Sequence, residues 1–99
     1  MDGTMRIFER RFAIYMMLLI YKNPGKTKSW LVKYDDINYK TKYARLDELE
    51  DAGLIMIDED KRISNTKLVY PTELGKKIGK KLWDIHEMIG LIECEMDEY

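Results

Sequence analysis

The sequence predicts an α+β domain that is mostly helical, with one two-stranded antiparallel ribbon set between long helices. Three observations predict it. The first is a charged helical pattern over 38–52, which stops at Gly53 and is followed by two short apolar runs with a polar segment between them. The second is a recurrence of apolar residues, in steps of four and three, from Ile78 to Met96. The third is a helical stretch over 6–22 that is apolar on more than one side.

The composition is that of one globular domain covering residues 1–99. Hydrophobic residues make up 45% of the chain and charged residues 35%, so disorder is not expected. The apolar run 12–21 is shorter than the roughly 20 residues of a bilayer span, and there is no signal-peptide pattern. We therefore expect a cytoplasmic protein. The single Cys94 excludes an internal disulfide; we expect a free thiol, although a bridge between two subunits stays open.

The amino-acid usage is typical of hyperthermophiles. The chain has no Gln and three Asn, and it is rich in Lys, Glu, Ile and Tyr. We expect the source to be a thermophilic archaeon, or a virus or plasmid of one.

The helix over 6–22 is expected to stop at Asn23-Pro24-Gly25, because Pro and Gly in succession break helices. A short helix over 28–34 follows, with Thr27 as its N-cap, and Asp35-Asp36 forms the next turn. The broad apolar surface of the first helix is hard to bury within one small chain. A partner chain would cover it.

The helix over 38–52, with Asn38 as its expected N-cap, carries its charges against its own dipole. Lys40 lies near the positive N-terminus, and Glu50 and Asp51 lie near the negative C-terminus. This arrangement costs stability, and a local rule broken in this way indicates a functional surface. A helix start that carries Lys is suited to approach phosphates.

The last third of the chain begins with short strands over 54–57 and 68–70, on either side of a polar loop over 58–67. Thr72 then caps a helix over 73–96, whose apolar residues follow a heptad pattern. We expect the first and last helices to form the interface of a homodimer. The expected interface residues are Phe8, Phe12, Tyr15, Leu19, Ile85, Ile89 and Ile92.

Two phrases carry a family resemblance, Leu49-Glu50-Asp51-Ala52-Gly53-Leu54-Ile55 and Thr72-Glu73-Leu74-Gly75. They resemble the end of the recognition helix and the start of the helix after the wing in winged helix-turn-helix transcriptional regulators, MarR- or PadR-like in the broad sense. The resemblance covers residues 26–80. It implies a winged helix-turn-helix fold with extended N- and C-terminal dimerisation helices, and a homodimer that binds a pseudo-palindromic operator on double-stranded DNA. It places the recognition helix at 38–52, the wing at 58–67 and the C-terminal dimerisation helix at 73–96.

The chain departs from the family pattern at Lys42, where the family has an aliphatic residue. Either Tyr43 or the stem of Lys42 must fill that space, so the register of the recognition helix is open by one residue. The wing is also short of Arg for a strong reader of the minor groove.

The resemblance implies a DNA-binding surface on the recognition helix and the wing. Lys40, Thr41, Ala44, Arg45 and Glu48 are expected on the outward side of the helix, and Tyr39 and Tyr43 are expected to pack at the core or its rim. We assign a base contact to Arg45, and backbone contacts to Lys61 and Arg62. The alternatives are a plain solvent face and an ordinary hairpin loop. The expected DNA-binding residues are Asn38, Lys40, Thr41, Lys42, Arg45, Lys61, Arg62, Asn65 and Lys67.

Charge is unevenly distributed, although the net charge is −1. Residues 1–46 carry ten Lys or Arg against four Asp or Glu, whereas residues 47–60 carry seven acids and no base. Such asymmetry can steer a duplex to one face. The near-zero net charge and the acidic block also suit a winged-helix protein–protein interaction module. A small architectural chromatin protein is a weaker alternative, since such proteins are usually basic.

The sequence contains no motif for catalysis or for a metal site. His86 is the only histidine, and no second ligand lies at a suitable spacing. We expect no enzymatic activity and no cofactor. Met16, Met17 and Met88 could line a pocket for a small-molecule effector, but core packing is the favoured interpretation, and an effector is unknown.

Overall fold

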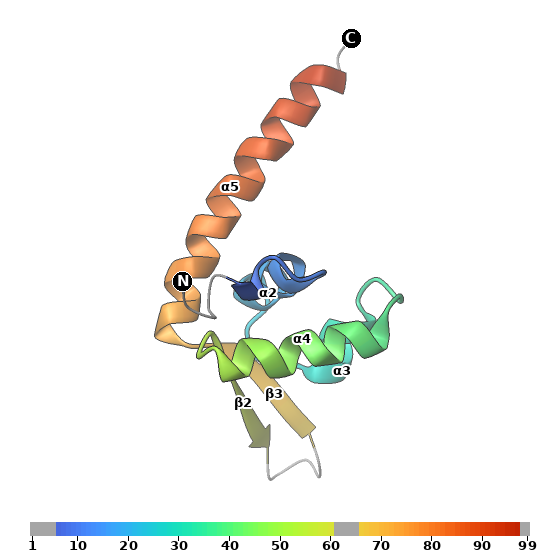
Figure 1. The fold of residues 1–99 in the computed structure, drawn as a ribbon, viewed down its shortest axis with the longest axis vertical. Coiled ribbons are helices and arrows are strands. Elements are labelled where there is room, and N and C mark those ends of the chain that lie inside the picture. Colours follow the sequence, from blue (N-terminus) through green and yellow to red (C-terminus); the bar gives the residue numbers. More distant parts are fainter. Residues whose placement is uncertain (1–5, 61–65, 98–99) are drawn as a thin grey trace.

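In a computed structural model the chain folds into short helices, a small antiparallel sheet and one long C-terminal helix (Figure 1). The structure describes residues 6–60 and 66–97, with side chains up to 59 and from 66 to 90. In chain order, the elements are α2 (Ala13–Lys22), β1 (Lys26–Thr27), α3 (Lys28–Lys33), α4 (Tyr39–Asp51), β2 (Ile55–Asp60), β3 (Thr66–Pro71) and α5 (Glu73–Asp97).

The sheet has the strand order β1-β3-β2, with both pairings antiparallel. β2 and β3 form the predicted ribbon, in which Ile55 lies opposite Pro71 and Ile57 lies opposite Val69. The sequence did not predict β1, whose Lys26 pairs with Val69 on the other edge of β3. This pairing holds the start of α3 beside the ribbon.

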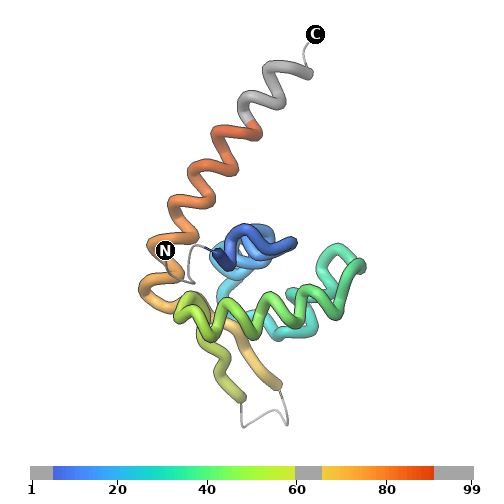
Figure 2. Tube along the Cα trace, viewed as in Figure 1, coloured from blue at the N-terminus to red at the C-terminus, as the bar shows by residue number. Residues whose placement is uncertain are grey.

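The core lies between α2, α3, α4 and the near end of the sheet (Figures 1 and 2). Met16 and Met17 are fully buried in it, so the methionines of α2 pack in the core, as favoured from the sequence. The buried apolar residues are Ile7, Ala13, Met16, Met17, Ile20, Leu31, Val32, Leu46, Leu49, Leu54, Ile55 and Val69.

Local signals at the ends of the helices act as the sequence predicts. The Thr27 side chain accepts a hydrogen bond from the Trp30 N–H at 3.0 Å and caps α3. Gly53 takes a left-handed conformation, with φ of 78°, and ends α4. The Thr72 hydroxyl accepts from the Gly75 N–H at 3.0 Å and donates to the Gly53 carbonyl at 2.7 Å, which joins the start of α5 to the end of α4.

α2 starts at Ala13 and residues 8–12 form turns, so the predicted continuous helix over 6–22 is wrong: it is interrupted between residues 7 and 13. Phe12 has φ of 69° and ψ of 1°, a left-handed conformation that aromatic residues rarely adopt. Its half-buried ring lies beneath the Arg11 guanidinium, 4.9 Å from the ring centroid, and edge-on to the Tyr15 ring. The turn at Phe12 sends the chain before it across α4.

α5 agrees closely with the predicted helix over 73–96. Its first turns pack on α2, where an added Cβ at Gly79 would lie 2.7 Å from the Tyr21 ring. Its C-terminal part extends away from the rest of the chain (Figure 1), and the longest dimension is 52 Å against 33 and 23 Å for the other two. Within the described residues, no helix combines the length and apolarity needed to cross a membrane.

Candidate nucleic-acid interface

α3, the turn after it and α4 form a helix-turn-helix unit. The turn contains two non-glycine residues in the left-handed region, Asp36 with φ of 60° and Asn38 with φ of 55°. The Tyr39 hydroxyl donates a hydrogen bond to the Asp36 carboxylate. Asn38 is the N-cap of α4, as predicted, but its side chain makes no capping hydrogen bond. It supplies instead a left-handed backbone that Asn tolerates, and this sets the direction in which α4 leaves the turn.

The exposed face of α4 is rotated from the predicted one. Lys40 is exposed as expected, but Thr41, Ala44, Arg45 and Glu48 are only partly exposed. The tyrosines lie at the rim, each 37% exposed. The exposed residues of the helix are Tyr39, Lys40, Tyr43, Asp47, Glu50 and Asp51.

An open groove of about 390 Å³ lies beside this face, between α4, the start of α3 and the first residues of β3. Lys28 and Ser29, which line it, were not predicted as site residues. The run Lys26-Thr27-Lys28-Ser29 is a signal that could have found them, because Lys and hydroxyl side chains bind phosphates. The groove is lined by Thr27, Lys28, Ser29, Tyr43, Thr66 and Lys67.

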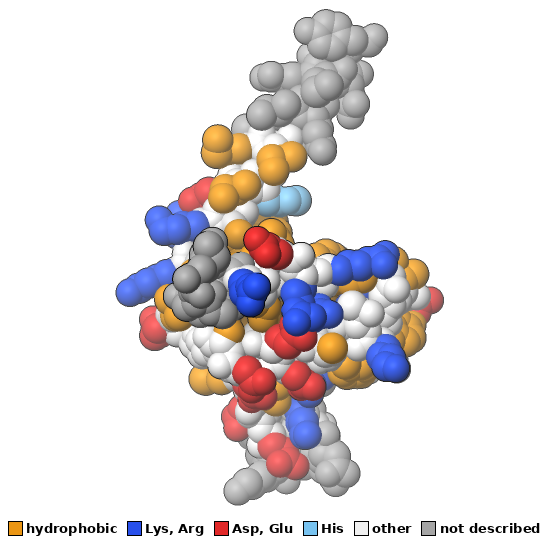
Figure 3. All heavy atoms as spheres, in the orientation of Figure 1, with side chains coloured by type: hydrophobic (Ala, Val, Ile, Leu, Met, Phe, Trp, Pro, Cys, Tyr) orange, Lys and Arg blue, Asp and Glu red, His pale blue; other side chains and the backbone are white. Residues whose placement is uncertain are grey.

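Charge changes sign along this surface. Lys40 is exposed near the start of α4, whereas Asp47 and Glu50 lie toward its C-terminus, where they line a second open pocket together with Glu59 and Lys67. Lys28 Nζ lies 3.8 Å from Asp47 Oδ1, so the two signs meet at the edge of the groove. Figure 3 shows acidic side chains gathered over the end of α4 and the adjoining ribbon. The start of α4, which lies away from these acids, is therefore the part of this surface that can approach a polyanion.

Lys42 does not lie on the exposed face of α4, which is inconsistent with the DNA contact predicted for this residue. Its side chain is fully buried and forms an ion pair with Asp35, with the Val32 carbonyl 3.4 Å from Nζ. Burial lowers the pKa of Lys42, because desolvation disfavours the charged form. The stem of Lys42 thus occupies the space that an aliphatic residue fills in the family pattern, and Tyr43 stays at the rim.

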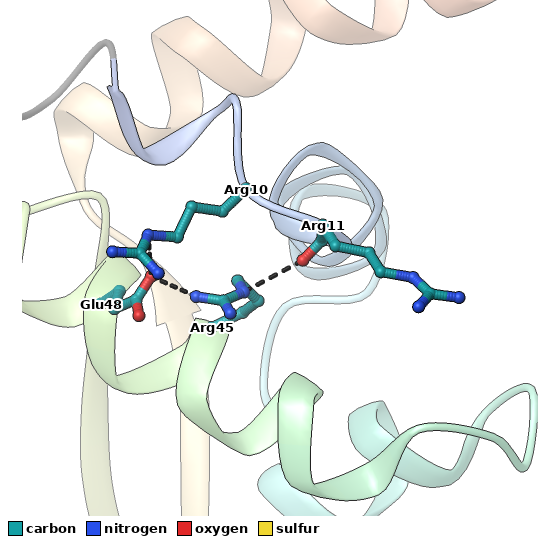
Figure 4. A network of polar contacts seen from close by, with 4 residues as sticks. All are labelled: Arg10, Arg11, Arg45 and Glu48. Atoms are coloured by element: carbon teal, nitrogen blue, oxygen red, sulfur yellow. Dashed lines mark hydrogen bonds and ion pairs between the residues drawn. The ribbon is translucent and has the colours of Figure 1, made fainter.

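Arg45 is also directed away from the open face, contrary to the exposed position predicted for a base contact. Its side chain is 11% exposed; Nε donates to the Arg11 carbonyl at 3.0 Å, and the guanidinium pairs with Glu48 (Figure 4). Arg10 approaches the same carboxylate at 3.5 Å. The turn at Phe12 brings Arg10 and the Arg11 carbonyl close to α4, so Arg45 connects α4 to the N-terminal segment.

The remaining DNA-binding predictions divide by position. Asn38 and Lys40 are exposed at the start of α4, Thr41 is half-buried, and Lys67 is exposed on β3. Lys61, Arg62 and Asn65 lie outside the described residues.

The predicted dimer residues also divide. Phe8, Phe12, Tyr15 and Leu19 are half-buried against the core of their own chain, so only part of each can meet a partner. On α5, Ile85 and Ile89 are each 52% exposed, and Met88 between them is 62% exposed. Figure 3 shows apolar side chains along the projecting part of this helix. The side chain of Ile92 lies outside the described residues.

Other candidate chemistry is limited. In the part of the chain that the structure describes, no three His, Cys, Asp or Glu side chains gather where they could hold a metal ion. An open apolar cavity of about 340 Å³ lies between α2 and α5. Its lining includes Tyr15, Lys22, Trp83 and His86, and not the methionines considered from the sequence.

A helix-turn-helix unit with an exposed second helix, followed directly by a two-stranded ribbon, defines a winged helix-turn-helix domain. The chain belongs to the winged helix-turn-helix family, whose sequence profile matches residues 10–90. No curated protein matches the chain in sequence.

Several solved structures share the fold. The transcriptional regulator SlyA superposes with a TM-score of 0.77 at 20% identity, over 84% of this chain and 58% of that one. Streptococcus pneumoniae FabT in complex with DNA superposes with a TM-score of 0.73 at 20% identity, over 90% of this chain and 61% of that one. A MarR transcriptional regulator from Methanosarcina mazei Go1 superposes with a TM-score of 0.73 at 23% identity, over 84% of this chain and 60% of that one. The chain therefore has the fold of MarR-family regulators, and it spans about three fifths of the length of these structures.

Proposed function

We propose that this chain is a sequence-specific DNA-binding transcriptional regulator, which acts as a homodimer on a pseudo-palindromic operator. The groove between α4, the start of α3 and the ribbon is the observation that carries the proposal. Lys28, Ser29 and Lys67 line it, and Lys40 is exposed on α4 about one turn before Tyr43, the α4 residue of the lining. Winged-helix domains lay such a helix in the major groove of DNA. That FabT has this fold and was solved in complex with DNA supports the assignment.

Within this proposal, the exposed bases position the duplex and the centre of α4 reads it. Lys40 and Lys67 are assigned to phosphates, and Tyr43 and Ser29 to the base edges or sugars between them. Lys61 and Arg62, in the wing, remain assigned to contacts with the DNA backbone.

The homodimer is proposed from α5. Its projecting part carries Ile85, Met88 and Ile89 with more than half of each side chain exposed, and these positions share one side of a helix. No other part of the described chain covers them. A second copy of the same helix would bury this apolar stripe, and the resulting two-fold axis would place the two α4 helices on half-sites about 34 Å apart.

Lysine substitutions at the groove test the DNA assignment. Lys40→Ala and Lys67→Ala should each weaken binding to every duplex and reduce the salt dependence by about one unit of slope. Lys80→Ala is the matched control, because Lys80 is 70% exposed on α5 and pairs with Asp84 at 3.6 Å. Fluorescence anisotropy titrations at several salt concentrations would measure all three. If the groove variants behave like the control, the groove is not the DNA site.

A second function is favoured by the acidic end of the surface. Asp47, Glu50, Asp58 and Glu59 are all exposed there, and phosphates would be repelled by them. A winged-helix interaction module with a basic protein partner would use this end. That function would replace DNA binding if the wild-type chain bound no duplex at low salt.

A further inference from the structure

Lys42 is the one fully buried charged side chain among the described residues, and it lies on the helix proposed to read DNA. It points inward from the second turn of α4, opposite to the exposed lysine at position 40. Moving an ammonium group from water into the protein interior costs free energy, so a lysine buried at this position needs a physical explanation.

The ammonium group joins four separate parts of the fold. Lys42 Nζ forms an ion pair with Asp35 in the turn after α3, and it lies 3.4 Å from the Val32 carbonyl in α3 itself. It also lies 5.4 Å from the ring centroids of Phe12, which precedes α2, and Tyr15, in the first turn of α2. One side chain of the recognition helix thus contacts α3, the turn and the start of α2.

These contacts are poorly explained by stability alone. An apolar side chain of the same length would fill the same space without the desolvation cost, and such replacements of buried ion pairs are often neutral or stabilising. The turn held by Asp35, however, contains the left-handed residues Asp36 and Asn38. Asp and Asn tolerate this conformation but do not require it, so contacts from outside the turn are needed to select it. Asn38 directly precedes α4, so the turn determines where the first turn of that helix lies.

We propose that Lys42 is a positioning residue for DNA recognition, which holds Asp35 and thereby fixes the turn and the start of α4 in the orientation that presents Lys40 and Tyr43 to the duplex. This inference rests on the proposed function, in which the exposed face of α4 meets DNA. Lys42 itself does not contact DNA. Its contribution is therefore to geometry and not to phosphate neutralisation.

The salt dependence of binding separates these two roles. Lys42→Met and the exposed control Lys40→Met make the same chemical change two residues apart on one helix. Lys40→Met should reduce the slope of log affinity against log salt by about 0.9, because a phosphate contact is lost. Lys42→Met should leave the slope unchanged, weaken binding to the preferred duplex by about tenfold and reduce its preference over a scrambled duplex. Asp35→Asn combined with Lys42→Met should bind no more weakly than Lys42→Met alone.

A second measurement follows the turn without DNA. Amide hydrogen exchange in Lys42→Met should accelerate in residues 34–40 and stay unchanged in the ribbon strands. Wild-type affinity and selectivity in folded Lys42→Met would overturn the positioning role while leaving the proposed function in place. A reduced salt slope would overturn it in favour of direct phosphate contact. Failure of the wild-type chain to bind any duplex would overturn the proposed function and the positioning role together, whatever the exchange data show for the turn.

Discussion

Asp35→Asn is expected to destabilise the protein far more than its place in a surface turn suggests. The Asp35 side chain is 33% exposed, but its carboxylate pairs with the fully buried ammonium group of Lys42. The substitution removes the compensating charge and leaves Nζ only neutral acceptors, which are the new amide oxygen and the Val32 carbonyl at 3.4 Å, a long hydrogen bond. Removing one partner of a buried pair costs about 3–5 kcal/mol, and the partial exposure of Asp35 places the expected loss near the lower end, about 3 kcal/mol. The melting temperature should fall by about 12 °C or more.

Lys42→Met provides the comparison that isolates the cause. It removes the buried charge and keeps the side-chain volume, so its unfolding free energy should lie within about 1 kcal/mol of wild type, or above it. The double variant should match Lys42→Met, because the loss of Asp35 matters only when the ammonium group is present. The coupling between the two sites should then be about 2–3 kcal/mol. Urea unfolding followed by circular dichroism, at one fixed protein concentration, would measure it. If Asp35→Asn stays within about 0.5 kcal/mol of wild type, or if the two substitutions are additive, the reasoning is refuted.

Ile89→Glu should yield a monomer in light scattering, because it places a charge in the apolar stripe of α5, whereas Glu87→Lys on the opposite side of the helix should remain a dimer. A dimeric Ile89→Glu would remove the stripe from the interface. The Tyr15 hydroxyl is buried with no hydrogen-bond partner among the described residues, and burial raises the pKa of this phenol. Tyr15→Phe should therefore leave thermal stability unchanged or raise it by about 1 kcal/mol, and a clear loss would count against that. Asp47→Asn should strengthen binding to all duplexes, since it removes a negative charge beside the groove; weaker binding to one sequence only would instead reveal a base contact. Because burial lowers the pKa of Lys42 below its usual 10.5, the unfolded chain binds more protons than the native chain between these two values. The unfolding free energy of wild type relative to Lys42→Met should thus rise as pH increases toward 10.5, and a difference independent of pH would contradict the assignment.

Most of the fold follows from local signals in the sequence. Thr27 and Thr72 supply capping oxygens, and Gly53 supplies a left-handed residue, so the ends of α3, α4 and α5 are set within a few residues of each signal. The periodicity of α5 is long enough to be read directly. β1 was missed because two residues, Lys26 and Thr27, carry no alternation, and the strand exists only through its pairing with β3.

The candidate site was predicted less well, because its geometry depends on contacts between distant residues. The break at Phe12 has no Gly or Pro to mark it, yet it brings the Arg11 carbonyl to Arg45 and so turns that side chain from the open face. Lys42 was predicted as a DNA-binding residue, and whether its stem or Tyr43 fills the core position was left open; full burial of its charged group is unusual for a lysine. Its burial depends on a carboxylate, Asp35, and on rings that fold around it from other elements. The local sequence pattern was enough to predict that α4 is a helix. Which side of that helix is exposed depends on tertiary contacts.

The most direct test of the central claim is an equilibrium titration of the wild-type chain with a duplex selected from a random pool, beside a scrambled duplex, at several salt concentrations. We expect two chains bound per site, half-sites about one helical turn apart, and affinity for the selected duplex at least about 10³-fold tighter than for the scrambled one, falling steeply with salt. Equal weak affinity for both duplexes, or no binding at low salt, would contradict the account and direct attention to the acidic end of α4 as a protein-binding surface.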